Sequence, residues 1–145
     1  MDKSVLVIAS GNPRKVAEIS GMLNVLNLIV QKQPETLNVE ETGDSYSENA
    51  LLKAQAAATK TNSWALADDS GLEVDYLDGR PGIYSARYAK SKDEKLKKLI
   101  REMGNTPYRT ARFISCMVLC DPNGKLVKET TGTVSYTHLT LPTKG

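Results

Sequence analysis

Residues 5–19 read VLVIASGNPRKVAEI, and this stretch predicts the fold class. Val5–Ala9 is a short continuous apolar run rich in β-branched side chains, the pattern of a central strand that is covered on both faces. Turn-forming residues follow at 10–13, and apolar residues then recur from Val16 onward at helical spacing. Pro13 suits the first turn of that helix, because its missing N–H leaves no hydrogen bond unmade there. A strand, a polar turn and a helix in this order open an α/β unit.

The next hundred residues alternate between apolar runs and polar turns. We expect a strand at 28–30, mostly loop from 31 to 43, and a helix that begins with the capping-box spacing of Ser45 and Glu48. Four apolar residues at 64–67 predict another strand, which leads directly into an acidic turn at Asp68–Gly71. The remaining expected elements are a strand at 72–76, a loop at 78–82, an amphipathic helix at 93–103, and a hairpin of strands 109–120 and 125–131 joined by a turn at 121–124.

Composition limits the class of protein. The chain has 145 residues, of which 40% are hydrophobic and 25% charged, so one domain with one core is expected. A formal net charge of +2 gives too weak a field to favour a nucleic-acid polymer as partner. The two cysteines fit core side chains better than a zinc site or a disulfide framework. No stretch is long and apolar enough to span a bilayer or to serve as a secretory leader, so a cytoplasmic protein that does not bind membranes is expected.

Residues 10–15, SGNPRK, lie where the first strand meets the first helix. Backbone N–H groups at a helix N-terminus, a glycine without Cβ and the cations of Arg14 and Lys15 would together favour a phosphate. The segment is not a Walker A loop and lacks the glycines of a dinucleotide fingerprint. A simple helix start therefore stays open as the other interpretation.

Acidic and amide side chains gather in two further segments. Asn49 and Lys53 lie four residues apart on one helix face, where they could reach the same ligand or form solvent-exposed partners. Asp68 and Asp69 are adjacent at the end of an apolar strand, which is costly unless a cation or hydrogen-bond donors compensate them. A hard ion such as Mg²⁺ takes one or two carboxylates and fills its other positions with water and phosphate oxygens. A metal or catalytic role is thus favoured over a structural one for the acidic pair.

Four segments together resemble the inosine/xanthosine triphosphate pyrophosphatase family. They are SGNPRKVAEI at 10–19, EETGDSYSENA at 40–50, ADDSGLEVD at 67–75 and GRPGIYSARYA at 79–89, and the similarity continues to about residue 132. The resemblance implies an elongated mixed β-sheet flanked by helices, of the inosine triphosphatase type, in a homodimer. It also implies Mg²⁺-dependent hydrolysis of ITP, dITP and XTP to the monophosphate and pyrophosphate.

The resemblance also implies roles for particular residues. Asp69 would be the catalytic proton acceptor, and Glu41 and Asp69 would be metal ligands. The expected substrate-binding residues are Ser10, Gly11, Asn12, Pro13, Arg14, Lys15, Lys53 and Ser70.

The chain departs from the family pattern after the expected hairpin. The family's Phe-Gly-Tyr-Asp-Pro and Ser-His-Arg segments, which hold the base, have no match. Residues 1–133 are therefore interpreted as an incomplete pyrophosphatase domain, and residues 134–145 as a tail unlike the family and foreign to it. His138 lies in this tail and is given no role. A non-catalytic fragment that binds nucleotide weakly or not at all, and a broader triphosphatase with a different base preference, stay open as alternatives.

Overall fold

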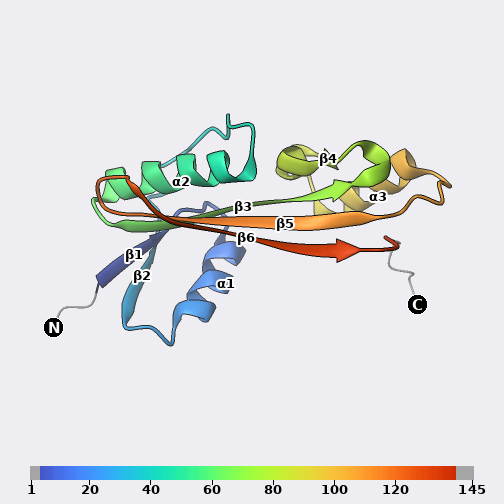
Figure 1. The fold of residues 1–145 in the computed structure, drawn as a ribbon. Coiled ribbons are helices and arrows are strands. Elements are labelled where there is room, and N and C mark those ends of the chain that lie inside the picture. The colour runs from blue at the N-terminus through green and yellow to red at the C-terminus, as the bar shows by residue number, and fades with distance from the viewer. Residues whose placement is uncertain (1–3, 140–145) are drawn as a thin grey trace. The chain divides into compact units, whose positions relative to one another are not determined.

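The computed structural model describes residues 4–139, which form two compact units. The first unit comprises the residues up to Asp69 together with Cys116–Thr130, and the second comprises Ser70–Ser115 and the residues from Thr131 onward. A six-stranded sheet has the order β2-β1-β3-β5-β6, with β4 paired to β3. The bounds are β1 Ser4–Ile8, α1 Pro13–Leu23, β2 Leu28–Lys32, α2 Tyr46–Thr61, β3 Trp64–Val74, β4 Arg80–Pro81, α3 Lys92–Met103, β5 Ala111–Cys120 and β6 Leu126–Tyr136 (Figure 1).

The first unit is an α/β arrangement around β1. β1 pairs in parallel with β2 on one side and with β3 on the other, with Leu6 opposite both Val30 and Trp64. Leu6 and Ile8 pack with Ile19 of α1 in one apolar cluster. Because side chains alternate along a strand, Val7 faces the other way, where α2 contacts β1. The two helices thus cover opposite faces of this part of the sheet, as Figure 1 shows.

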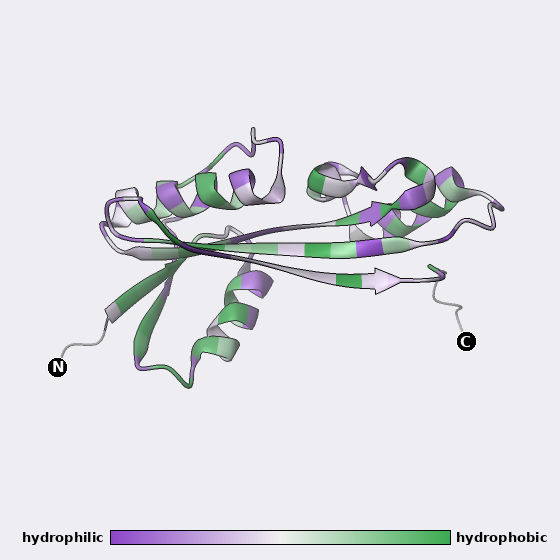
Figure 2. Cartoon of the chain, viewed as in Figure 1, coloured by the Kyte–Doolittle hydropathy of each residue, from purple (hydrophilic) through white to green (hydrophobic). Residues whose placement is uncertain are grey.

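Local signals explain how α2 begins and packs. The Ser45 side chain accepts a hydrogen bond from the backbone N–H of Glu48, and the Glu48 carboxylate accepts one from the N–H of Asp44, so the expected capping geometry is present. The buried face of the helix carries small residues that allow close approach to the sheet: Ala50, Ala54, Ala57 and Ala58 are all fully buried. β1 and β2 are hydrophobic over most of their length (Figure 2).

The second unit has its own apolar core. Val74, Leu99, Met103 and Ala111 are buried together, so the apolar stripe of α3 packs as expected. Here β3 pairs antiparallel with β4, which makes the sheet mixed. Two short 3-10 helices, Asp75–Leu77 and Gly82–Arg87, flank β4. The expected mixed sheet flanked by helices is confirmed.

The prediction of an acidic turn at Asp68–Gly71 is wrong. β3 runs without interruption from Trp64 to Val74, and the polar residues lie inside it. Successive side chains of a strand point to opposite faces, so Asp68 and Asp69 point away from each other. The two negative charges are thus separated without a turn. The strand expected at 72–76 is the end of β3, followed by a 3-10 helix.

The hairpin of β5 and β6 is confirmed: β5 begins at Ala111 and not at residue 109, and β6 runs five residues beyond its expected end at residue 131. The Asp121 carboxylate accepts hydrogen bonds from the N–H groups of Asn123 and Lys125, which closes the turn. β6 continues to Tyr136, so the first residues of the predicted foreign tail at 134–145 are in a strand. Residues 140–145 lie outside the described residues.

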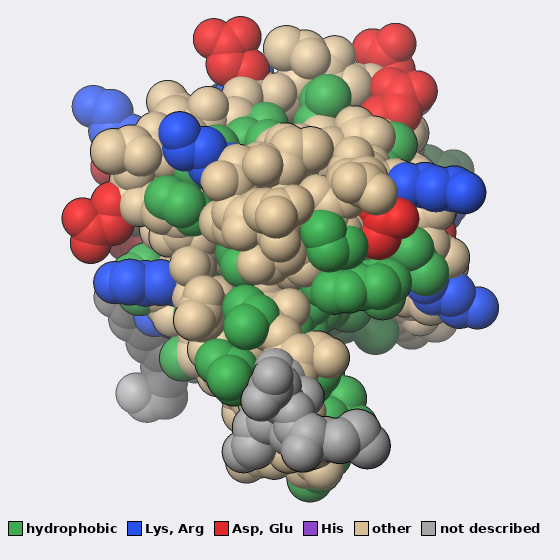
Figure 3. Space-filling view, turned by 90° about the vertical axis from the view of Figure 1, so that its left-hand side faces the viewer, with side chains coloured by type: hydrophobic (Ala, Val, Ile, Leu, Met, Phe, Trp, Pro, Cys, Tyr) green, Lys and Arg blue, Asp and Glu red, His purple; other side chains and the backbone are tan. Residues whose placement is uncertain are grey.

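Several hydrophobic side chains of the first unit reach the surface. Val25 is 85% exposed and Met22 63%. Figure 3 looks onto the side that lies at the left of Figure 1 and shows hydrophobic side chains gathered at the surface there. Within residues 4–139, none of the helices combines the length and apolar character needed to cross a membrane.

Candidate functional site

The strand order places a ligand-binding edge in the first unit. β1 connects through α1 to β2 on one side, and β2 connects through α2 to β3 on the other side, with the two helices on opposite faces. In open α/β sheets, ligands bind beyond the carboxyl ends of the strands where the chain reverses direction in this way. The pairing of β1 with β3 ends at Ile8 and Leu66. Residues 10–15 and the two aspartates at 68 and 69 therefore follow directly beyond this edge.

Residues 10–15 form a helix N-terminus with free access from solvent. Asn12 caps α1 by accepting a hydrogen bond from the Arg14 N–H at 3.0 Å, and Ser10 Oγ accepts one from the Asn12 N–H at 3.1 Å. Pro13 occupies the first helical turn, as expected. Residues 11–14 are exposed, so the helix terminus and its cations are available to an anion.

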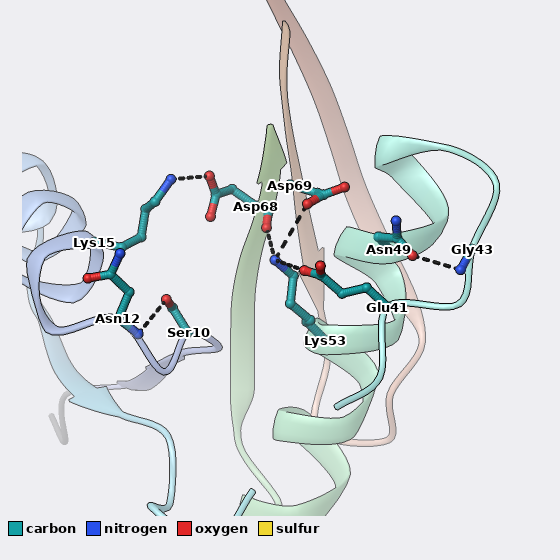
Figure 4. Close-up of polar contacts among 9 residues, drawn as sticks. All are labelled: Ser10, Asn12, Lys15, Glu41, Gly43, Asn49, Lys53, Asp68 and Asp69. Atoms are coloured by element: carbon teal, nitrogen blue, oxygen red, sulfur yellow. Dashed lines mark hydrogen bonds and ion pairs between the residues drawn. The ribbon is translucent and has the colours of Figure 1, made fainter. Parts of the chain in front are cut away.

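The two aspartates bind different lysines on opposite faces of β3 (Figure 4). Asp68 Oδ2 lies 2.7 Å from Lys15 Nζ. Asp69 Oδ1 lies 3.9 Å from Lys53 Nζ. Each carboxylate thus lies close to a positive charge, as expected for two adjacent buried aspartates. The positive charges are lysines of α1 and α2. Lys15 and Lys53 are thereby held on either side of the same strand.

Lys53 is the centre of the α2 side of the site. Its ammonium lies 3.1 Å from Glu41 Oε1 and also donates a hydrogen bond to the backbone carbonyl of Asp68. Together with Asp69 Oδ1, three oxygens from two separate segments thus lie around the Lys53 ammonium. The side chains of Lys53, Glu41 and Asp69 are 20%, 22% and 10% exposed, so solvent screens their charges only partly.

Asn49 connects the loop that carries Glu41 to β3. Its side-chain oxygen accepts a hydrogen bond from the Gly43 N–H at 2.7 Å, and its side chain lowers the pKa of Asp69. Asn49 is 2% exposed, which rules out the interpretation of Asn49 and Lys53 as solvent-exposed partners. A Cβ on Gly43 would lie 2.6 Å from the Glu48 Cβ and 2.8 Å from Asn49 Oδ1. Only glycine fits this closely packed loop.

Burial raises the pKa of Asp69 from 3.8 to about 6. Within this net shift, the positive charge of Lys53 and the Asn49 side chain lower the pKa, while the negative charges of Glu41 and Asp68 raise it. Among the described residues, no hydrogen-bond donor satisfies Asp69 Oδ2, which is buried. A carboxylate with these properties can accept a proton near neutral pH and has one oxygen ready for another partner.

The structure brings together most of the site residues expected from the sequence. Ser10 to Lys15, Glu41, Lys53 and Asp69 all belong to the first unit and lie at the edge described above. Ser70 is the first residue of the second unit, where it lines a cavity of about 370 Å³ with Gly71 and Phe113 among others.

The family resemblance gave no role to Asp68 or Asn49, although the residue patterns had raised both as candidates and both contact the site. Asp68 holds Lys15, and Asn49 holds the loop of Glu41 next to Asp69. The spacing of four between Asn49 and Lys53 was the available signal for Asn49. Nothing local indicated that the two neighbouring aspartates would contact different lysines.

Fold and site together define an α/β protein with a helix N-terminus, two lysines and a buried carboxylate at the carboxyl edge of parallel strands. Residues 6–140 match the sequence model of the Ham1 family, and the chain belongs to this family. It is 49% identical over 132 residues to a dITP/XTP pyrophosphatase of Synechococcus sp. (strain CC9311), covering 91% of this chain and 64% of that protein. A protein of the same name from Parasynechococcus marenigrum (strain WH8102) is 46% identical, with 88% and 65% covered.

Solved structures agree in fold. The Ham1 protein of Staphylococcus aureus has a TM-score of 0.79 and 40% identity, covering 91% of this chain and 70% of that chain. A HAM1 protein from Coxiella burnetii has a TM-score of 0.81 and 32% identity, covering 91% and 71%. The chain spans 64–65% of the length of the two pyrophosphatases named above.

Proposed function

We propose that this chain carries the triphosphate-binding and catalytic part of a hydrolase that converts dITP, XTP and ITP to the monophosphate and pyrophosphate. The observation that carries the proposal is the carboxylate of Asp69, which is buried, has a raised pKa and lies beside Lys53 at the strand edge. The names of the relatives from Synechococcus and Parasynechococcus support the dITP and XTP part of this substrate class.

The charges of the site suit a triphosphate. Lys15 and the N-terminus of α1 lie on one face of β3 and Lys53 on the other, so both can neutralise phosphate oxygens. Lys15 pairs with Asp68 and would exchange this partner for a phosphate oxygen. Arg14 is exposed beside it and adds a further positive charge.

Magnesium fits the residues on the α2 side. Glu41 and Asp69 supply carboxylate oxygens, and Asp69 Oδ2 is buried without a donor among the described residues. Within residues 4–139 no group of three or more His, Cys, Asp or Glu side chains is arranged to hold a metal ion. Mg²⁺ commonly binds one or two carboxylates plus substrate phosphates, so this set is suitable only together with the triphosphate. When bound, the ion would supply charge neutralisation of the phosphate oxygens.

The reaction then requires a base and a held substrate. Lys15 and Lys53 would hold the triphosphate while water attacks the α-phosphorus, and the bond to the oxygen bridging the α- and β-phosphorus breaks to release pyrophosphate. Asp69 would accept the proton of the attacking water. The Asp69 side chain is only 10% exposed, so the base is held in a largely buried position.

A pyrophosphate-release assay with ITP, dITP, XTP, dGTP and ATP tests the proposal. The chain should prefer the first three, and Asp69→Asn should lower turnover by about 10²–10⁴-fold, the usual contribution of a positioned base. Glu40→Gln is the matched control, because Glu40 is an exposed carboxylate beside Glu41. EDTA should abolish release and Mg²⁺ should restore it. A folded chain without release above background would favour the non-catalytic fragment, and equal turnover of all five substrates the broader triphosphatase.

We also propose a cytoplasmic homodimer. The exposed apolar side chains of Met22 and Val25 support a further contact surface. Sedimentation at micromolar concentration tests the dimer, and a monomer at all concentrations would argue against it.

A further inference from the structure

The ammonium of Lys53 lies among the oxygen types that a divalent cation binds. Two carboxylates and one backbone carbonyl face it: Glu41 Oε1 at 3.1 Å, Asp69 Oδ1 at 3.9 Å and the carbonyl of Asp68. Hard divalent cations take the same donors, carboxylate and carbonyl oxygens. The lysine therefore lies where these three oxygens could also face a divalent cation.

We propose that Lys53 is an internal counter-ion that prevents a divalent cation from binding between Glu41 and Asp69 until a triphosphate gives the lysine another partner. The metal would then bind with the nucleotide and not before it. This inference rests on the proposed function, because it concerns the same metal and the same substrate.

Lys53 is held firmly enough to act in this way. It projects from α2, a helix that is capped by Ser45 and packed through fully buried alanines, so its backbone is fixed. Its own side chain is 20% exposed and makes three polar contacts. A cation that entered between the two carboxylates would meet this ammonium at close range, where like charges repel strongly in a partly buried site.

The lysine does not satisfy the carboxylates completely. Its distance of 3.9 Å to Asp69 Oδ1 is too long for a hydrogen bond, and Asp69 Oδ2 has no donor among the described residues. One ammonium carries a single positive charge against two carboxylates. The two carboxylates can therefore still attract a divalent cation once the lysine has moved to the phosphates.

The mechanism requires that metal and triphosphate bind cooperatively. A triphosphate brings several negative charges, which can pair with Lys53 and with the metal at the same time. By thermodynamic linkage, the nucleotide must then increase the affinity for the metal by the same factor by which the metal increases the affinity for the nucleotide. Removing the lysine charge should raise the metal affinity of the nucleotide-free protein and reduce this coupling.

Binding of Mn²⁺ to the nucleotide-free protein, followed by electron paramagnetic resonance, tests the inference without any turnover. Lys53→Met should bind Mn²⁺ at least ten-fold more tightly than wild type. Lys60→Met is the matched control, because Lys60 is an exposed lysine seven residues further along the same helix, and it should bind as wild type does. Lys53→Arg, which keeps the charge, should stay as weak as wild type. Lys53→Gln replaces the methionine variant if that protein does not fold.

The outcomes separate this inference from the proposed function. Equal Mn²⁺ affinity of wild type and Lys53→Met without nucleotide would overturn the counter-ion role. A second titration adds a non-hydrolysable ITP analogue, which should tighten Mn²⁺ binding in wild type more than in Lys53→Met. Failure of wild type to bind Mn²⁺ even with the analogue would overturn the metal-dependent function, while the comparison without nucleotide still decides the role of Lys53.

Discussion

Replacing Asp69 by asparagine is expected to stabilise the fold, by an amount that grows with pH. Burial raises the pKa of this carboxyl from 3.8 to about 6, with Glu41 and Asp68 adding to the effect. The folded protein therefore binds a proton more readily than the unfolded chain does between these two values. Stability from this group is present at low pH and is lost as pH rises through that window. Asparagine has no such charge to bury.

The size of the effect follows from the pKa difference. One pKa unit corresponds to about 1.4 kcal/mol, so the shift of about two units costs about 3 kcal/mol at pH 8, where Asp69 is ionised in both states. At pH 4.5, where the folded form is mostly protonated, the cost is about 1 kcal/mol. The side chain is only 10% exposed, so solvent screens its charge little. The advantage of the variant should thus increase by about 2 kcal/mol between pH 4.5 and pH 8.

Urea unfolding followed by circular dichroism measures this difference directly. Wild type and Asp69→Asn are compared at each pH in the presence of EDTA, so that no divalent cation compensates the carboxylate. The pH dependence of the groups that do not interact with Asp69 is common to both proteins and cancels in the difference. A difference in unfolding free energy that stays constant from pH 4.5 to pH 8 would refute the argument that Asp69 carries the cost of a buried charge.

Three further substitutions test other contacts of the structure. Lys15→Ala should weaken binding of a triphosphate analogue in calorimetry, and unchanged affinity would remove Lys15 from the site. Asn49→Ala removes the acceptor of the Gly43 N–H and the side chain that lowers the pKa of Asp69, so it should cost about 1–3 kcal/mol and move the acid limb of the pH–rate profile upward. An unmoved limb would show that Asn49 is only structural. Gly71→Ala would place a Cβ 2.2 Å from a backbone carbonyl oxygen and should destabilise by about 2 kcal/mol or more in urea, whereas wild-type stability would contradict the packing.

Much of the fold could be predicted because its signals are local. The apolar run before Ser10, the proline at the start of α1 and the spacing of Ser45 and Glu48 act over a few residues. Asp121 likewise closes the hairpin by hydrogen bonds to its own turn. Such patterns depend on backbone geometry that neighbouring residues largely set, so they could be read before the structure was known.

Local patterns did not predict the structure of the acidic segment. Asp68 and Asp69 looked like a turn, because adjacent charges after an apolar run are uncommon inside a strand. The strand continues through them because Lys15, 53 residues earlier, and Lys53 on α2 supply a cation on each face.

By itself the sequence determined the α/β class, the caps and turns, and the family resemblance with its site residues. Only the tertiary structure decided that the two aspartates face opposite ways, that Asn49 is buried and holds the Gly43 N–H, and that Lys53 lies close to the carboxylates of Glu41 and Asp69. The physical reason is that a charge is compensated by whatever lies within a few ångströms, and those neighbours come from segments that are distant along the chain.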